Sequence, residues 1–138
     1  MRAVNQKARK VLDILVTNLN ENNPVKKINN AEGAFMAVCV EDISCLYGAD
    51  YGRIFSVAHY YTQNGDAMRD PEMIFWKDAN GDFYPAYFRQ DGYFGTEQET
   101  IKFDEKGEPA RFARKRQTEQ AMFAGKWMEN IKYQQGLK

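Results

Sequence analysis

The fold is decided by the middle of the chain, residues 53–90, which reads RIFSVAHYYTQNGDAMRDPEMIFWKDANGDFYPAYFRQ. Segments rich in β-branched and aromatic residues, which are typical of β-strands, occupy 53–62, 68–77 and 83–90. The pairs Asn64-Gly65 and Asn80-Gly81 separate these segments. Asn-Gly is the preferred pair for a tight hairpin turn, because both central residues need a positive φ. The stretch therefore predicts an antiparallel meander.

The flanking segments add further strands and a helix at each end. Strands are predicted at 34–40 and 96–103, and residues 114–135 have the spacing of a helix. Residues 3–22 also have apolar side chains at helical spacing, namely Val4, Ala8, Val11, Leu12, Leu15 and Leu19. The sequence predicts one α+β domain over residues 1–138. We expect an antiparallel meander of about five strands, with both helices on one face of the sheet.

Composition excludes several classes of protein. Lys and Arg together number 19, as do Asp and Glu, so the 138-residue chain has no net charge with its one His neutral. A DNA mimic would be strongly acidic, and a generally basic nucleic-acid binder strongly basic. No apolar run approaches the ~20 residues of a membrane span, and the N-terminus lacks a signal peptide's apolar segment. We expect a cytoplasmic protein that does not contact a membrane.

The sequence offers little for a metal or a cofactor. Cys39 and Cys45 do not form a CxxC motif and are expected to be reduced thiols. The carboxylates of Asp66, Asp70 and Glu72 match no calcium-binding loop, so no metal site is predicted. No dinucleotide, P-loop, zinc-protease or serine-hydrolase motif occurs, which argues against the common cofactor and hydrolase classes. No cofactor is expected.

The two Asn-Gly turns predict a register. Counting outward from two-residue turns places His59 opposite Asp70, and Glu72 opposite both Val57 and Arg89. Side chains alternate between the faces of a strand, so His59, Asp70, Glu72 and Arg89 would share one face. Glu97 or Glu99 would join them from the next strand. A slip of one residue would reverse the faces, and Pro71 favours a bulge at this point.

This polar cluster allows two interpretations. A His beside a carboxylate is the pairing used for general acid–base catalysis, so His59 with Asp70 and Glu72 could serve a small hydrolase or nuclease-like enzyme. Arg89 could then position a substrate. The alternative is that these are ordinary cross-strand ion pairs of a solvated sheet, worth roughly 0.2–1 kcal/mol each. No Ser or Cys is placed as an obvious nucleophile on this face.

Two further surfaces are candidates for binding. Tyr93 and Phe94 follow a turn and could form an aromatic contact tip, since aromatic residues are enriched at the centres of interfaces. They could equally fold back over the end of the sheet. Arg111, Arg114, Lys115 and Arg116 form a basic cluster at the start of the last helix. Cations are unfavourable there, which hints at a further role, and they could contact phosphates, although such clusters are usually only solvated.

The segments AHYYTQNGDAMRDPEMIFW (residues 58–76) and FYPAYFRQD (residues 83–91) resemble a family of small uncharacterised proteins. This family is encoded by phages, plasmids and conjugative elements of gut bacteria. The resemblance covers most of the chain but brings no established activity. It implies an accessory protein of a mobile element that acts on host or rival machinery. The leading prediction is therefore a non-enzymatic protein that binds an unidentified protein partner. The alternatives are the small enzyme and a weak nucleic-acid binder.

Overall fold

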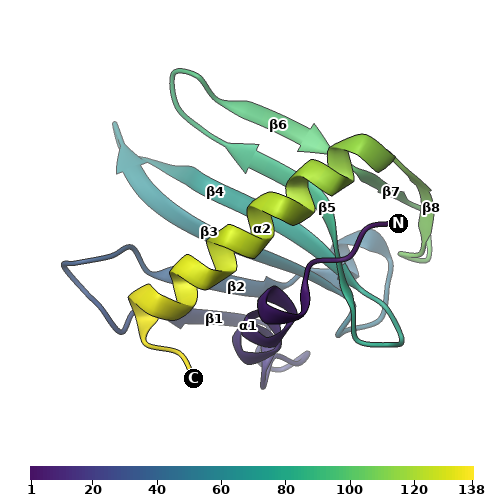
Figure 1. The fold of residues 1–138 in the computed structure, drawn as a ribbon, viewed down its shortest axis with the longest axis horizontal. Helices are drawn as coiled ribbons and strands as arrows, with labels where there is room; N and C mark the ends of the chain where they lie inside the picture. The colour runs from purple at the N-terminus through teal and green to yellow at the C-terminus, as the bar shows by residue number, and fades with distance from the viewer.

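The computed structural model describes all 138 residues and contains a six-stranded antiparallel sheet with both helices on one face (Figure 1). The strands lie in chain order: β1 (Val25–Ile28), β2 (Val38–Asp42), β3 (Ile54–Gln63), β4 (Asp66–Lys77), β5 (Phe83–Gln90) and β6 (Thr96–Glu99). A separate hairpin follows, formed by β7 (Ile101–Phe103) and β8 (Pro109–Phe112). The helices are α1 (Gln6–Val16) and α2 (Arg114–Gln135), with a short 3₁₀ helix, η1 (Ser44–Tyr47). The predicted α+β meander is confirmed.

Helix α1 is shorter than predicted, although its apolar stripe is correct. It begins at a cap, where the Asn5 side chain accepts a hydrogen bond of 2.8 Å from the Ala8 backbone N–H. It ends at Val16, because Thr17 is extended and Asn18 adopts a φ of 70°. Asn tolerates this left-handed conformation better than most residues, so the helix stops well before Pro24. Neither helix is both long and apolar enough to cross a membrane.

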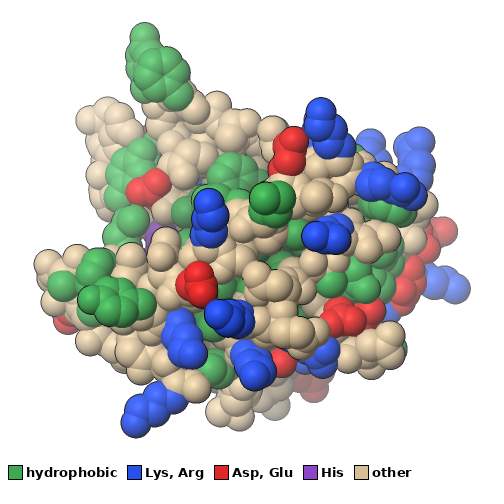
Figure 2. Space-filling view, viewed as in Figure 1, with side chains coloured by type: hydrophobic (Ala, Val, Ile, Leu, Met, Phe, Trp, Pro, Cys, Tyr) green, Lys and Arg blue, Asp and Glu red, His purple; other side chains and the backbone are tan.

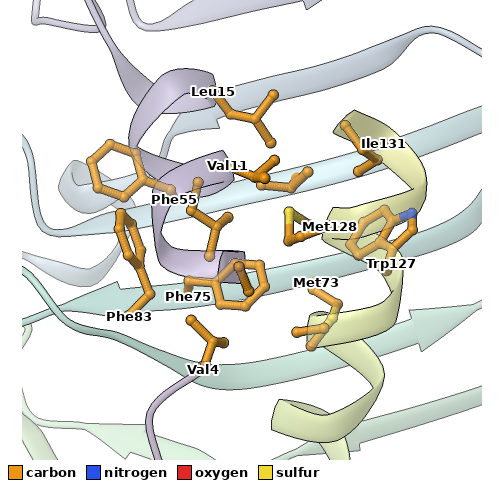
Figure 3. Packing of buried hydrophobic residues seen from close by; sticks show 14 of the residues in the cluster. Val4, Val11, Leu15, Phe55, Met73, Phe75, Phe83, Trp127, Met128 and Ile131 are labelled. Atoms are coloured by element: carbon orange, nitrogen blue, oxygen red, sulfur yellow. The ribbon is translucent and has the colours of Figure 1, made fainter. Parts of the chain in front are cut away.

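The face that carries the helices, here called the helix face, holds the main core. It is a cluster of 16 buried residues drawn from α1, α2, strands β2 to β5 and Val4, which precedes α1. Figure 3 shows side chains from the two helices and the sheet converging in this core. Phe75, Leu12 and Met128 are fully buried there. Burial of this much apolar surface is the main favourable term in folding.

The opposite face of the sheet has a smaller core under η1 and the β7–β8 hairpin. Six buried residues form it: Ile43, Ala49, Ile54, Ile74, Ala86 and Ile101. Tyr47 of η1 meets Phe103 of β7 edge to face, with ring centroids 5.1 Å apart. The hairpin turn approaches so closely that a Cβ on Gly107 would lie 2.3 Å from that of Ala49. Together, η1 and the β7–β8 hairpin cover only part of the opposite face of the sheet.

The β3–β4 hairpin follows the predicted register only near its turn. Gln63 pairs with Asp66 and Tyr60 with Arg69, as the Asn64-Gly65 turn requires. Beyond this point Asp70 and Pro71 together oppose His59, and Ala58 pairs with Glu72. Pro71 has no N–H to give to the ladder, so β4 bulges here. The predicted pairing of Val57 with Glu72 is therefore wrong, since Val57 pairs with Met73, and His59 faces the bulge instead of forming a ladder pair with Asp70.

The β4–β5 hairpin has the predicted register far from its turn, but the turn itself is longer than predicted and a bulge compensates for it. Glu72 pairs with Arg89 and Ile74 with Tyr87, as predicted, but nearer the turn Lys77 pairs with Phe83. The turn is longer than two residues, because Asp78 N–H donates to the Asp82 carbonyl (3.0 Å) and the Asp78 carboxylate accepts from Asp82 N–H (2.9 Å). A second bulge, between Ile74 and Phe75, restores the register.

The predicted strand 96–103 is divided at Thr100, and β1 and β8 were not predicted. Thr100 is buried, and its hydroxyl donates to the Pro85 carbonyl at 2.8 Å. This bond separates β6, which stays in the sheet, from β7, which pairs with β8 instead. The chain then enters α2 at Arg114, as predicted.

Candidate functional site

A network of five charged side chains crosses three strands on the opposite face, here called the Asp91 network: Arg69, Glu72, Arg89, Asp91 and Glu97. Arg69 Nε lies 3.0 Å from Glu72 Oε1, and its Nη1 lies 3.7 Å from Asp91 Oδ2. Arg89 Nε donates to Asp91 Oδ1 at 2.8 Å, and Arg89 Nη1 lies 4.0 Å from Glu97 Oε2. The predicted grouping of Glu72, Arg89 and Glu97 is confirmed as geometry.

Asp91 fastens the β5–β6 loop to β4. Its backbone N–H donates to the Arg69 carbonyl (2.9 Å), and its carboxylate accepts from the Arg69 N–H (2.9 Å). The backbone N–H of Arg69 and then the Arg89 guanidinium lower the pKa of Asp91. In return, the hydrogen bond that Arg89 donates to Asp91 raises the pKa of Arg89. The hydrogen bonds that hold the base of the loop therefore favour the ionised form of Asp91.

The loop carries two exposed aromatic residues, Tyr93 and Phe94, here called the aromatic tip. Their exposed fractions are 95% and 91%. The two rings contact each other edge to face, with centroids 4.8 Å apart. Figure 2 shows hydrophobic side chains projecting beyond the rest of the surface at the end of this loop. The expectation of a projecting tip thus describes this conformation better than the alternative of rings folded over the sheet.

A hollow of about 540 Å³ lies between the β3–β4 turn and the β5–β6 loop. Eleven residues line it, and only two of them are hydrophobic. Arg69, Arg89, Asp91 and Glu97 from the Asp91 network are among them. Gly92 and Gly95 also line it, so the aromatic tip stands at its rim. The arrangement places a projecting apolar contact beside a polar recess.

His59 is not part of this site. It is 5% exposed, and its Nδ1–H donates to the Ala37 carbonyl at 2.9 Å. Its ring lies edge-on to Trp127 of α2, with centroids 5.5 Å apart, and it forms no ion pair with a carboxylate. Asp70 instead accepts a hydrogen bond of 2.6 Å from Gln90 Nε2. The bulge at Asp70-Pro71 leaves His59 on the helix face and Glu72 on the opposite face.

Comparison with known families matches residues 9–137 to a family described as a domain of unknown function, DUF6908. The chain belongs to this family. Searches of the curated proteins and of the solved structures each found no match. The DUF6908 match assigns no activity, and the predicted origin in phages, plasmids and conjugative elements stays a prediction.

Sequence reasoning missed three residues at or beside the candidate site, namely Ser56, Arg69 and Asp91. Ser56 donates its hydroxyl to Glu72 Oε2 at 2.7 Å, while Arg69 and Asp91 hold the network together. Arg69 could have been found, because the Asn64-Gly65 turn already places it opposite Tyr60.

Burial, followed by the charge of Glu72, raises the pKa of Tyr60. No group of three or more His, Cys, Asp or Glu side chains could hold a metal ion.

The predicted basic cluster is brought together, at the other end of β6. Arg111 lies on β8, and Arg114, Lys115 and Arg116 form the first turn of α2. Arg111 and Arg116 line a second hollow, of about 400 Å³, which shares no residue with the hollow beside the aromatic tip. The four cations thus form a surface of their own.

Proposed function

We propose that the protein is a non-enzymatic binding protein that contacts a protein partner through the aromatic tip. The observation that carries the proposal is the pair Tyr93 and Phe94, each more than nine-tenths exposed at the end of a loop. Exposed single apolar residues are ordinary, but two adjacent aromatic rings projecting together are a costly feature in water. Aromatic side chains of this kind dominate the energetics of protein interfaces.

Burial of the aromatic tip in a partner would supply a large favourable term for binding. An aromatic side chain buries roughly 150–250 Å² when it enters a pocket. At about 25 cal/mol per Å², two such rings contribute on the order of 7–12 kcal/mol before the costs of association. The hydrogen bonds of Asp91 already order the base of the loop. Less conformational entropy is then lost on binding.

The Asp91 network would form the polar rim of the interface. Its two arginines and three carboxylates pair with one another within the protein and leave one net negative charge. The partner that fits is a protein with an apolar pocket for the rings and hydrogen-bonding groups around it. The resemblance to accessory proteins of mobile elements supports a partner in host or rival-element machinery.

The test is site-specific photo-crosslinking in cells. A p-benzoylphenylalanine at position 93 should give one or a few defined protein adducts. Tyr133 offers a matched control, because it is also a surface tyrosine, 83% exposed, but lies on α2. The same probe at position 133 should not give these adducts. Identical adducts from both positions, or none from position 93, would contradict the proposal.

A further inference from the structure

We infer that a second surface, formed by the β7–β8 hairpin and the first turn of α2, binds the phosphate backbone of single-stranded nucleic acid. This basic patch consists of Lys102, Arg111, Arg114, Lys115 and Arg116. All five side chains are exposed. The patch includes no residue of the aromatic tip or the Asp91 network, so the inference is independent of the proposed function.

The cations of the basic patch have no acidic partners. None of the five forms an ion pair within the protein. By contrast, Arg9, Arg53, Arg69 and Arg89 each form one with an Asp or Glu. The whole chain is neutral, so an unpaired group of five cations concentrates positive charge on one part of the surface. Figure 2 shows Lys and Arg side chains gathered over the beginning of α2.

The arrangement of these cations is unfavourable for folding. Lys102 pairs directly with Arg111 across the β7–β8 ladder, and like charges in this position destabilise a hairpin. The first turn of α2 has three cations, no acidic residue and no side-chain cap. Cations there oppose the helix dipole. A bound polyanion would relieve both costs.

The shape of the surface fits an extended strand with exposed bases. The hollow of about 400 Å³ is lined by Lys102, Arg111 and Arg116, with Glu99 as the one acidic residue. Arg116 is positioned there, because its Nη1 donates to the Glu99 carbonyl at 3.1 Å. Phe112 also lines the hollow and is 40% exposed. Exposed aromatic rings beside cations are the stacking platforms on which unpaired bases lie.

The beginning of the chain lies against α2, just beyond the basic patch. The Arg2 backbone N–H donates to Gln117 Oε1 at 2.8 Å, which holds the beginning of the chain against α2. Figure 1 places the N-terminus beside the start of α2 and the β7–β8 hairpin.

A single strand is favoured over a duplex, because the bases of a duplex are stacked inside it and cannot reach Phe112.

The test is fluorescence anisotropy with a labelled 20-nucleotide oligodeoxythymidylate, titrated between about 50 and 200 mM NaCl. Affinity should fall with salt, with a slope of roughly 0.7 per phosphate contact. Lys102→Gln with Arg111→Gln should reduce the slope by about 1.4 and weaken binding at least about tenfold at 50 mM. Lys10 and Lys126 are also exposed and unpaired, and both lie on helices away from the hairpin. Their double Gln variant should bind within about twofold of the wild type.

A second variant tests the aromatic contact. Phe112→Ala should weaken binding without changing the salt slope, since it removes stacking and no charge. The melting temperature of the Lys102→Gln, Arg111→Gln variant should be unchanged or raised, which separates lost binding from lost folding. Three results would overturn the inference. The first is no binding at 50 mM NaCl, or binding that does not weaken as salt is raised. The others are an equal loss of affinity in the Lys10, Lys126 control variant, and tighter binding of a 20-base-pair duplex than of the single strand.

Discussion

The two faces of the six-stranded sheet are covered in different ways. On the helix face, α1 and α2 close over a continuous cluster of 16 buried residues. On the opposite face, η1 and the β7–β8 hairpin cover only six, and the surface then changes to the charged Asp91 network. Along β4 the two faces alternate, with Phe75 on the first and Ile74 on the second. The difference indicates that the helix face provides most of the apolar burial, while the opposite face is held in part by paired charges.

The largest expected effect on stability distinguishes Phe75 from its neighbour Ile74. Phe75→Ala should lower the free energy of unfolding by about 3–5 kcal/mol, because a fully buried ring is lost from the larger core. Ile74→Ala should cost about 2 kcal/mol, the lower end for such a change, because its cluster is small and it is 7% exposed. Urea denaturation measures both. Equal losses would mean that the two cores contribute alike and would remove the basis of the comparison.

A smaller effect is expected for the charged part of the opposite face. Asp91→Asn should cost about 1.5–3 kcal/mol at pH 7, because hydrogen bonds to an ionised carboxylate are lost. The pKa of Asp91 is lowered in the folded state, so its contribution is present above the ordinary carboxyl pKa of about 3.9. It should disappear as the pH falls through the lowered value.

Urea denaturation of the wild type and Asp91→Asn at pH 7 and at lower pH measures this dependence. The difference in stability between the two proteins should shrink as the solution becomes acidic. Asp50→Asn is a suitable control, since Asp50 is exposed and forms no ion pair. It should leave the stability within about 0.5 kcal/mol of the wild type. A constant difference for Asp91→Asn across pH would mean that the carboxylate does not act through its charge.

The arrangement of the strands could be predicted from local signals, but the bulges could not. The Asn64-Gly65 turn fixes the pairs from Gln63–Asp66 to Tyr60–Arg69, because turn chemistry acts over a few residues. The bulge opposite His59 depends on Pro71 and on the packing of His59 against Trp127. That contact joins residues far apart in the sequence. A hydrophobic pattern in one strand carries no information about it.

The candidate site could likewise be predicted only in part from local sequence signals. Glu72, Arg89 and Glu97 were predicted as neighbours, and they are, but the prediction of Glu72–Arg89 assumed a two-residue turn at Asn80-Gly81. A longer turn and a bulge shift the register in opposite directions, so the far end of the hairpin is correct. Asp91 was missed because its role comes from its contacts with Arg69 on another strand. Turn sequences alone do not show which side chains will fasten a loop.

The smallest expected effect on stability concerns the aromatic tip. Tyr93→Ala with Phe94→Ala should change the free energy of unfolding by less than about 0.5 kcal/mol, because both rings are almost fully exposed and bury little surface. The same variant should weaken binding of a partner captured at position 93 by about 30-fold or more, as expected for interface residues worth at least 2 kcal/mol. Urea denaturation and a binding titration measure the two quantities. A loss of stability comparable to that of Ile74→Ala would show that the rings support the fold, and the tip would then belong with the buried clusters in this comparison. Lost binding at unchanged stability would instead show that the rings serve binding and not the fold, unlike Asp91, whose hydrogen bonds hold the base of the same loop.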